Sequence, residues 1–336
     1  MIDFVDEIRS KLEGMDGSIV FPEAYDQRVL KAADMLTREK FNLKIILLGN
    51  PDELSNIASE NNIDISKFEI INWKNSELIE EFSEEFFELR KHKGVSKDDC
   101  HNYISNDVNA FGAMMVRKGL ADGMVSGSMS PTADVIRAAI WIVQPKKGIK
   151  TVSSFFVMVS NDESIGDSGR VIFSDCAFVV DPTPEQLSDI TINAAGAAKF
   201  FLNSEPMVAL LSYSTFGSGS GNSVDRVRQA VKILKDRGVD FKFDGEMQFD
   251  AAISPSVASI KCPDSEVGGK ANTFIFPNLD SGNIGYKIAQ RIGKMKAYGP
   301  VLVGLNKPIN DLSRGCSAED IYVTSLMTLL QVKSHI

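Results

Sequence analysis

The chain has 336 residues, of which 43% are hydrophobic and 24% are charged. These are the proportions of a folded globular protein, and they exclude a disordered, collagenous or coiled-coil chain. At roughly 150 residues per domain, the length predicts about two domains. The 36 Lys and Arg residues against 45 Asp and Glu residues give a net charge of -9, which argues against binding nucleic acid or an anionic membrane over a broad face. An anionic small molecule could still bind in a local cationic pocket.

Two further features limit the class of protein. No apolar run approaches the roughly 18 residues that a membrane-spanning helix requires, and the first six residues carry acids where a secretory or transit peptide carries bases. We therefore expect a cytoplasmic protein. No cysteine or histidine pair has the spacing of metal ligands, which predicts reduced thiols and no metal site, and argues against a zinc enzyme or a Ser-His-Asp hydrolase. The cysteines are Cys100, Cys176, Cys262 and Cys316, and the histidines are His92, His101 and His335.

The first 143 residues alternate between strand-like and helix-like segments and begin with a βαβ pattern. The predicted strands cover residues 18–21, 43–48 and 123–126, and the predicted helices cover residues 26–40, 75–93, 97–118 and 131–143. Residues 144–148, which include a proline and a glycine, interrupt this pattern. They form the predicted linker between two domains.

After this linker, two strand-like segments flank the turn-rich residues 161–170, which predicts a hairpin with antiparallel pairing. Helices and strands then alternate again. The predicted strands cover residues 151–159, 171–173, 207–211 and 273–276, and the predicted helices cover residues 184–202, 223–237, 283–294 and 317–333. Such alternation predicts mainly parallel sheets covered by helices, the α/β class. The last helix could pack on either domain, and the pattern alone does not decide between them.

A hydroxyl-rich loop, residues 126–132, joins a predicted strand to a predicted helix. Its hydroxyls and backbone amides lie where the helix dipole favours an anion, so the loop is typical of a phosphate cradle. Alternatively, Ser130 caps the helix and Pro131 takes its first position. The glycine-rich segment 217–221 is a weaker signal, because it lacks the spacing of a dinucleotide fingerprint or a P-loop. We interpret it as a surface turn.

Two arginines are candidates for binding an anion. Arg90 has Phe86 and Phe87 at the positions one turn before it, so it lacks an acidic partner on its own helix. Arg137 has Asp134 three residues before it, so an ion pair on the helix face is the alternative to a binding role. The residues alone leave both alternatives open.

The stretch before the last predicted helix places a hydroxyl, a guanidinium and a thiol in one turn. These groups belong to Ser313, Arg314 and Cys316. Asp320 follows Ser317 with capping-box spacing, so the structural alternative is that its carboxylate caps the helix. Cys316 is either a nucleophile with a lowered pKa or an inert thiol.

Six segments, in order from residue 88 to residue 317, resemble the phosphate acetyltransferases (phosphotransacetylases), within the phosphate acetyl/butyryltransferase family. They are residues 88–94, 111–115, 121–127, 283–291, 304–308 and 310–317. The last segment resembles the C-terminal signature of these enzymes. One such motif is a weak signal, whereas six in the same order are highly specific.

The resemblance implies an α/β fold with two three-layer α/β/α domains, mainly parallel but partly mixed sheets, and an active site in the cleft between the domains. It assigns the last helix to the first domain. That domain then consists of residues 1–145 and 297–336, and residues 146–296 form the second domain. The resemblance also implies a homodimer.

The resemblance further implies the reversible reaction acetyl-CoA + phosphate ⇌ CoA + acetyl phosphate, by direct attack of the CoA thiolate. CoA is then a substrate, and no cofactor or metal is expected. At the matching motif positions, Asp320 is the expected base for the CoA thiol, Ser313 orients the thiol or leaving group, and Arg314 stabilises the developing charge. The expected substrate-binding residues are Arg90 and Arg137 for the CoA phosphates, Ser128 and Thr132 for acetyl phosphate, and Lys287.

Two alternatives stay open. The first is phosphate butyryltransferase, a related enzyme for longer acyl chains, although the intact motif at residues 313–317 favours acetyl. The second is a non-catalytic acetyl-CoA-sensing module, like the phosphotransacetylase-like domain of some malic enzymes, and the complete C-terminal motif argues against it. A nicotinamide-dependent dehydrogenase lacks support, because no cofactor fingerprint is present.

Overall fold

The computed structural model describes residues 3–334 and consists of two compact units, each with its own sheet. The first unit combines Met1–Lys146 with Leu305–Ile336, and the second unit is Lys147–Gly304. The first unit is therefore built from both ends of the chain, whereas the second is one continuous segment. Met1, Ile2, His335 and Ile336 lie outside the described residues.

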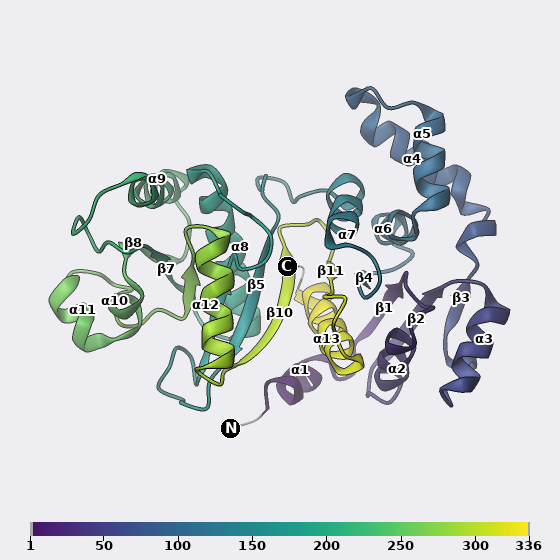
Figure 1. Cartoon of the computed structure of the whole chain (residues 1–336), viewed down its shortest axis with the longest axis horizontal. Helices are drawn as coiled ribbons and strands as arrows, with labels where there is room; N and C mark the ends of the chain where they lie inside the picture. Colours follow the sequence, from purple (N-terminus) through teal and green to yellow (C-terminus); the bar gives the residue numbers. More distant parts are fainter. Residues whose placement is uncertain (1–2, 335–336) are drawn as a thin grey trace. The chain divides into compact units, whose positions relative to one another are not determined.

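The first unit contains a five-stranded sheet in the order β11-β4-β1-β2-β3, and every pair of neighbours is parallel (Figure 1). Its strands are β1 (Asp16–Phe21), β2 (Asn42–Leu48), β3 (Glu69–Ile71), β4 (Gly123–Ser126) and β11 (Ile309–Asp311). Residues 19–21 of β1 and 45–48 of β2 are buried, as expected for parallel strands that are covered on both faces.

Helices of the first unit cover both faces of this sheet. They are α1 (Phe4–Leu12), α2 (Gln27–Leu36), α3 (Pro51–Glu60), α4 (Leu78–Arg90), α5 (Lys97–Asn106), α6 (Val108–Lys118), α7 (Thr132–Ala138) and α13 (Ala318–Ser334). The last helix, α13, contacts β1 and β4 and packs with α1 and α2, whereas α6 contacts the same strands and α7 contacts β11. The C-terminal helix is therefore part of the first unit.

Two predicted helices of the first unit are each divided in the structure. Residues 97–118 form α5 and α6, because Asp107 ends α5 and its carboxylate caps α6, accepting hydrogen bonds from two backbone N–H groups at 2.9 and 3.1 Å. Residues 131–143 form α7 and then the π-helix η4 (Ala139–Val143). Pro131 is the N-cap residue of α7, so the alternative in which Ser130 caps this helix is wrong.

The second unit contains a six-stranded sheet in the order β10-β5-β6-β9-β7-β8. β5 pairs antiparallel with both β6 and β10, and the other neighbours are parallel. Its strands are β5 (Ser153–Val159), β6 (Arg170–Ser174), β7 (Met207–Leu211), β8 (Lys242–Met247), β9 (Thr273–Ile275) and β10 (Lys296–Val303), and its helices are α8 (Pro184–Phe201), α9 (Asn222–Arg237), α10 (Phe249–Ile253), α11 (Pro255–Lys261) and α12 (Leu279–Arg291). The predicted α/β class, with mainly parallel and partly mixed sheets, is confirmed.

Residues 297–304, assigned from the sequence to the first domain, belong to the second unit. They form most of β10, whose partner β5 begins at Ser153, far earlier in the chain. Gly299 and Pro300 interrupt the apolar alternation of β10, which conceals the strand from pattern analysis.

Within residues 3–334, no helix has the length and apolar content needed to cross a bilayer. The same described part of the chain holds no group of His, Cys, Asp and Glu side chains that could bind a metal ion.

Candidate active site

The carboxyl ends of two neighbouring strands bring two of the candidate loops together. In the first unit, β11 and β4 pair so that Asp311 lies opposite Ser126. The loop after β11 contains Arg314, and the loop after β4 contains Ser128. In open parallel sheets, ligands bind beyond the carboxyl ends of the strands. The structure therefore places two predicted sites, far apart in sequence, at one edge of the sheet.

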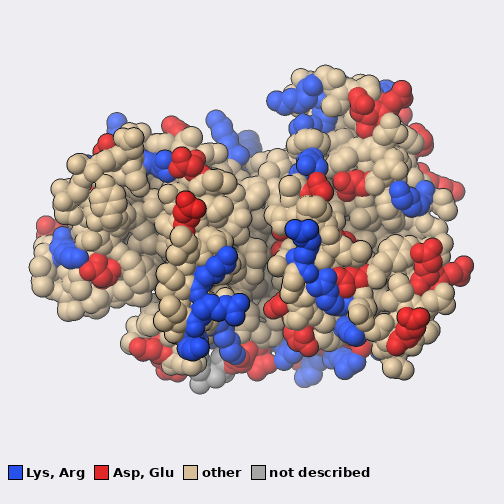
Figure 2. Space-filling view, viewed as in Figure 1, with Lys and Arg blue, Asp and Glu red and all other residues tan. Residues whose placement is uncertain are grey.

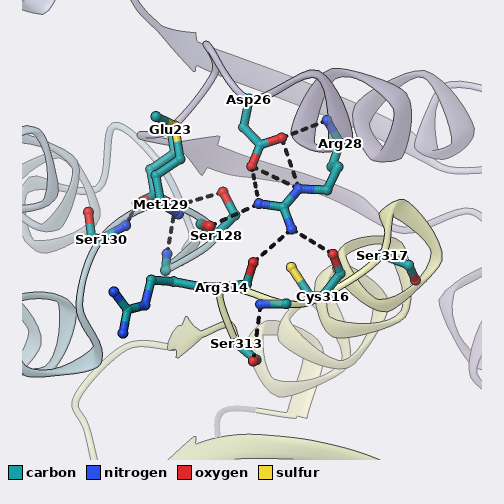
Figure 3. Close-up of polar contacts among 12 residues, drawn as sticks. Glu23, Asp26, Arg28, Ser128, Met129, Ser130, Ser313, Arg314, Cys316 and Ser317 are labelled. Atoms are coloured by element: carbon teal, nitrogen blue, oxygen red, sulfur yellow. Dashed lines mark hydrogen bonds and ion pairs between the residues drawn. The ribbon is translucent and has the colours of Figure 1, made fainter.

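Arg28, at the start of α2, joins these two loops (Figure 3). Its Nη1 donates to the backbone carbonyl of Arg314 at 2.9 Å and to that of Cys316 at 2.7 Å. Its Nη2 donates to the backbone carbonyl of Ser128 at 2.9 Å. Hydrogen bonds from a charged donor are stronger than neutral ones, so one guanidinium fixes the backbone of both loops. The sequence analysis missed Arg28, because its partners are 100 and 286 positions away.

Asp26 holds the Arg28 guanidinium in place. Its carboxylate accepts hydrogen bonds from Nε at 3.0 and 3.1 Å and from Nη2 at 2.6 Å. Burial, the largest influence, raises the pKa of Asp26, but the hydrogen bonds from Arg28 outweigh it, and the pKa lies below its ordinary value. The pair is therefore ionised at neutral pH. The only sequence signal for this ion pair is the spacing of Asp26 and Arg28, an acid and a base two residues apart at the start of a predicted helix.

Ser313 and Arg314 are exposed on the loop after β11. The hydrogen bond from Arg28 fixes the backbone of Arg314, while the guanidinium of Arg314 extends away from Arg28 (Figure 3). Among residues 3–334, the Arg314 guanidinium makes no hydrogen bond or ion pair, and the Ser313 hydroxyl accepts one bond, from the Gly315 N–H at 3.3 Å. The loop thus presents a cation and a hydroxyl on a fixed backbone.

Asp320 forms a capping box with Ser317, which is the structural alternative that the sequence analysis named for Asp320. Its Oδ2 accepts hydrogen bonds from the Ser317 N–H at 2.9 Å and the Ser317 hydroxyl at 3.0 Å, and its own N–H donates to that hydroxyl at 3.1 Å. The side chain is exposed. Its Oδ1 accepts no hydrogen bond from the described residues, so one carboxylate oxygen can still receive a proton.

Cys316 is enclosed below this loop and is 7% exposed. Burial raises the pKa of its thiol, and the nearby Arg28 only partly opposes this effect. A thiol with a raised pKa is a poor nucleophile. Of the two alternatives for Cys316, the geometry favours the inert thiol.

The loop after β4 does not offer its amides to a ligand, because Glu23 already binds them. Oε2 of Glu23 accepts hydrogen bonds from the N–H of Gly127 at 2.8 Å, the hydroxyl of Ser128 at 2.9 Å and the N–H of Met129 at 3.2 Å. Its Oε1 accepts one from the N–H of Ser130 at 2.6 Å. Glu23 and Ser128 are 5% and 2% exposed. The predicted phosphate cradle is therefore an internal carboxylate site, and Ser128 positions the loop instead of facing a substrate.

Replacing Glu23 with glutamine should lower the free energy of unfolding of the first unit by about 2 kcal/mol. Glutamine keeps the size of the side chain, but its NH₂ group cannot accept the bond that one carboxylate oxygen accepts. At least one buried loop donor then lacks a partner. Urea unfolding measures the change, and Glu60→Gln, at an exposed position on α3, is the matched control. Equal stability of both variants would show that the Glu23 contacts do not hold the loop.

Arg90 and Arg137 meet on one aromatic ring. Their guanidinium carbons lie 4.5 and 5.7 Å from the ring centroid of Trp141, which lies in η4. Arg137 also pairs with Asp134 at 2.7 Å, as its structural alternative predicted. Arg90 pairs with no carboxylate in the described chain, and its buried Nε has no hydrogen-bond partner there. The result is a cationic group supported by cation–π contacts. The sequence analysis missed Trp141, because no pattern marks it as the support of two arginines.

The glycine-rich segment 217–221 contacts an ion pair of the second unit between the buried Glu246 and the partly exposed Arg228. Glu246, 2% exposed, accepts hydrogen bonds from the Gly217 N–H at 2.9 Å and from Arg228 at 2.9 and 3.0 Å. Burial, the largest influence, raises the pKa of Glu246, but these bonds outweigh it and the pKa falls to about 2. The segment therefore has an internal structural role, in keeping with its interpretation as a turn.

Lys287 lies in the second unit, exposed on α12. Its Nζ is 5.7 Å from the ring centroid of Tyr286. Figure 2 shows basic side chains gathered over α12 and the segment after it, where Lys287, Arg291 and Lys294 are exposed. The substrate role of Lys287 stays a prediction.

Comparisons with known proteins agree with the six family-like segments found in the sequence. The sequence model of the family described as "Phosphate acetyl/butaryl transferase" matches residues 3–329. The chain is 44% identical to the phosphate acetyltransferase of Bacillus subtilis, over 98% of this chain and 99% of that protein. It is 43% identical to the phosphate acetyltransferase of Thermoanaerobacterium thermosaccharolyticum, over 99% and 100%. A solved phosphotransacetylase from Streptococcus pyogenes superposes with a TM-score of 0.92 and 45% identity, over 98% of each chain.

Proposed function

Because the chain belongs to the phosphate acetyl/butaryl transferase family, we propose that it is a phosphate acetyltransferase. This acyltransferase moves an acetyl group reversibly between acetyl phosphate and CoA, and it needs no cofactor besides these substrates. The observation that carries the proposal is the loop after β11. Arg28 fixes the backbone of this loop, while the Arg314 guanidinium and the Ser313 hydroxyl stay exposed.

The charge that develops in the reaction fits these two side chains. The CoA thiolate forms a bond to the acetyl carbon, the carbonyl oxygen becomes an oxyanion, and the bond to phosphate then breaks with its electron pair on the phosphate oxygen. A preorganised cation beside the oxyanion stabilises this transition state. Arg314 can supply it, because its guanidinium is not neutralised by an ion pair within residues 3–334. Ser313 orients the thiol or the leaving group.

In this mechanism the thiol proton goes to Asp320. Ser317 holds Oδ2 of Asp320, whereas Oδ1 accepts no bond from the described residues. The helix cap therefore orients the carboxylate without using its second oxygen. The capping role and the role as a base are compatible.

The remaining substrate contacts use two separate groups of residues. Arg90 and Arg137 bind the CoA phosphates on their common support, Trp141. Lys287, on α12, is a further proposed substrate-binding residue. Thr132, exposed at the start of α7, contacts acetyl phosphate. Because the Ser128 hydroxyl donates to Glu23, we do not assign Ser128 to acetyl phosphate, and Thr132 is the one predicted contact that remains.

Direct attack is favoured over an acetyl-enzyme on Cys316, because this thiol is buried and its pKa is raised. The two mechanisms differ when CoA is left out. Direct attack predicts that isotopically labelled phosphate does not exchange into acetyl phosphate without CoA. Exchange in the absence of CoA would indicate a covalent acetyl-enzyme and contradict direct attack, and exchange with CoA present serves as the positive control.

The acyl group is tested by comparing acetyl phosphate with butyryl phosphate. We propose acetyl as the preferred group, supported by the intact motif at residues 313–317 and by the identity to acetyltransferases. The value of kcat/KM should be higher for acetyl phosphate. A higher value for butyryl phosphate would move the assignment to phosphate butyryltransferase.

We also propose a homodimer that buries an apolar stripe on α12. Ile284, Ile288 and Ile292 recur every four residues and are 57%, 53% and 78% exposed, so they share one helix face. Ile288→Lys should convert a dimer to a monomer in sedimentation velocity, whereas Lys261→Glu, on α11, should leave it dimeric. A wild-type monomer, or a dimer that survives Ile288→Lys, would contradict this interface.

A cytoplasmic location completes the proposal. In the described part of the chain, all cysteines are buried and none forms a disulfide, which fits a reducing compartment. Besides the second copy in the homodimer, the partners proposed are small molecules: CoA, acetyl phosphate and phosphate.

A further inference from the structure

Trp141 lies within cation–π distance of both arginines that are proposed to bind CoA. It belongs to the π-helix η4, which directly continues α7. The guanidinium carbon of Arg90, the last residue of α4, lies 4.5 Å from the centroid of the Trp141 ring. The guanidinium carbon of Arg137, in α7, lies 5.7 Å from the same centroid. Two cations from different helices therefore meet at one ring.

Neighbouring aromatic side chains hold the Trp141 ring in one orientation. Tyr103 of α5 packs against it, with the ring centroids 5.8 Å apart and an interplanar angle of 58°. Phe86 of α4 packs in turn on Tyr103, with the centroids 5.2 Å apart. Tilted aromatic pairs stabilise each other beyond the area that they bury. Because the three rings come from three different elements, the Trp141 ring cannot turn without disturbing the whole row.

The two arginines differ in the partners that they have within residues 3–334. Arg137 forms an ion pair with Asp134 at 2.7 Å. Arg90 pairs with no carboxylate in that part of the chain, and its buried Nε has no hydrogen-bond partner there. A buried donor without a partner is unusual in a folded protein. The negative face of the indole ring attracts the Arg90 guanidinium without neutralising it, so its charge stays available to an anion.

We propose that Trp141 is a positioning residue that holds Arg90 and Arg137 in the orientation in which both bind phosphate groups of one CoA molecule. A free arginine side chain has many rotamers, and ordering it on binding opposes association. The ring already orders both guanidinium groups, so this loss of freedom occurs on folding and not on binding. Trp141 thereby strengthens CoA binding without touching the reacting atoms. The inference rests on the proposed function, because it takes CoA as the ligand of both arginines.

The test is the dissociation constant (Kd) for CoA, measured by isothermal titration calorimetry in the absence of acetyl phosphate. Trp141→Leu should raise this Kd about tenfold, because two arginine side chains must then be ordered on binding. For 3′-dephospho-CoA, which lacks one phosphate group, the same variant should raise the Kd about threefold, since one arginine fewer is engaged. At saturating CoA, kcat should stay within about twofold of wild type, because the loop after β11 is unchanged.

Two further variants separate the role of the ring from a general effect on folding. Trp141→Phe keeps an aromatic face and should return the Kd for CoA to within about threefold of wild type. Trp73→Phe is the matched control, because Trp73 also has a cation over its ring, Nζ of Lys74 at 4.4 Å from the centroid. In the described chain, neither Arg90 nor Arg137 lies over that ring. Trp73→Phe should therefore keep the wild-type Kd.

A fluorinated ring keeps the test decisive even if Trp141→Leu fails to fold. The chain has two tryptophans, so 5-fluorotryptophan incorporated into the Trp73→Phe protein labels Trp141 alone. Fluorine withdraws electron density from the ring face and leaves the shape of the ring nearly unchanged. The labelled protein should bind CoA about twofold more weakly than the unlabelled Trp73→Phe protein. A role of Trp141 in packing alone predicts equal affinities.

Three results would overturn the proposal. The first is a Kd for CoA that Trp141→Leu leaves within twofold of wild type, and the second is an equal increase of Kd for CoA and 3′-dephospho-CoA. The third is the same Kd for the fluorinated and the unlabelled Trp73→Phe protein. A wild type that binds CoA but does not turn over acetyl phosphate would contradict the proposed function instead. The failure of the inference and the failure of the function are therefore distinguishable.

Discussion

Arg314→Ala should lower kcat by about 10²–10³-fold, which is the loss expected when one preorganised donor to an oxyanion is removed. The Arg314 guanidinium is exposed and makes no hydrogen bond or ion pair in residues 3–334, so its charge can act on the substrate. Its loss removes a contact that becomes strong only as the carbonyl oxygen gains charge. Steady-state thioester formation measures the effect, and the KM for CoA should change far less than kcat.

The matched control is another arginine of the first unit. Arg38, which lies just after the end of α2, pairs with Asp34 four residues earlier in the chain, and the Arg38 side chain is 72% exposed. Arg38→Ala should keep kcat within about twofold of wild type, because the charge of Arg38 is already paired with Asp34 and makes no contact with the described loops after β4 and β11. Equal rates for Arg314→Ala and the wild type would remove Arg314 from the mechanism.

Asp320→Asn should lower kcat about 100-fold or more at neutral pH, the range for loss of a general base. Transfer of a proton from an ordinary thiol to an ordinary aspartate carboxylate in water is uphill by about 6 kcal/mol, so we expect the transfer to accompany attack on the acetyl carbon. The deficit should shrink as the pH rises toward the pKa of the thiol, because the thiolate then forms without the base. A profile of kcat against pH measures this recovery.

The capping box supplies a control that separates the two roles of Asp320. An asparagine side chain can still accept a hydrogen bond from the Ser317 N–H, so Asp320→Asn keeps most of the cap but lacks the base. Ser317→Ala removes the hydroxyl of the cap and keeps the carboxylate. It should cost about 1 kcal/mol of stability and little activity. Near wild-type kcat in Asp320→Asn, with loss in Ser317→Ala, would reduce Asp320 to a helix cap.

The parts of the fold that follow from local pattern were predictable from the sequence. The buried apolar strands β1 and β2 and the hairpin of β5 and β6 have clear sequence signals, and the structure contains them. Strands with weak signals were missed: β8 is largely polar, and β10 is interrupted by Gly299 and Pro300. The domain boundary depended on β10, whose pairing is set by contacts distant in sequence.

The same division applies to the candidate site. Ser313 and Arg314 lie in a motif of consecutive residues, so the sequence identified them. Arg28 and Glu23 are isolated in sequence and act through backbone groups 100 or more positions away. The prediction that the loop after β4 offers free amides to a phosphate was wrong for a related reason, because a loop sequence does not show that a distant carboxylate has bound those amides.

The central claim is tested most directly by mixing the purified protein with CoA and acetyl phosphate and following thioester formation, with Arg314→Ala beside it. We predict rapid turnover that phosphate reverses and that the variant loses. An absence of turnover in a wild type that still binds acetyl-CoA would contradict the assignment and indicate an acetyl-CoA-sensing module.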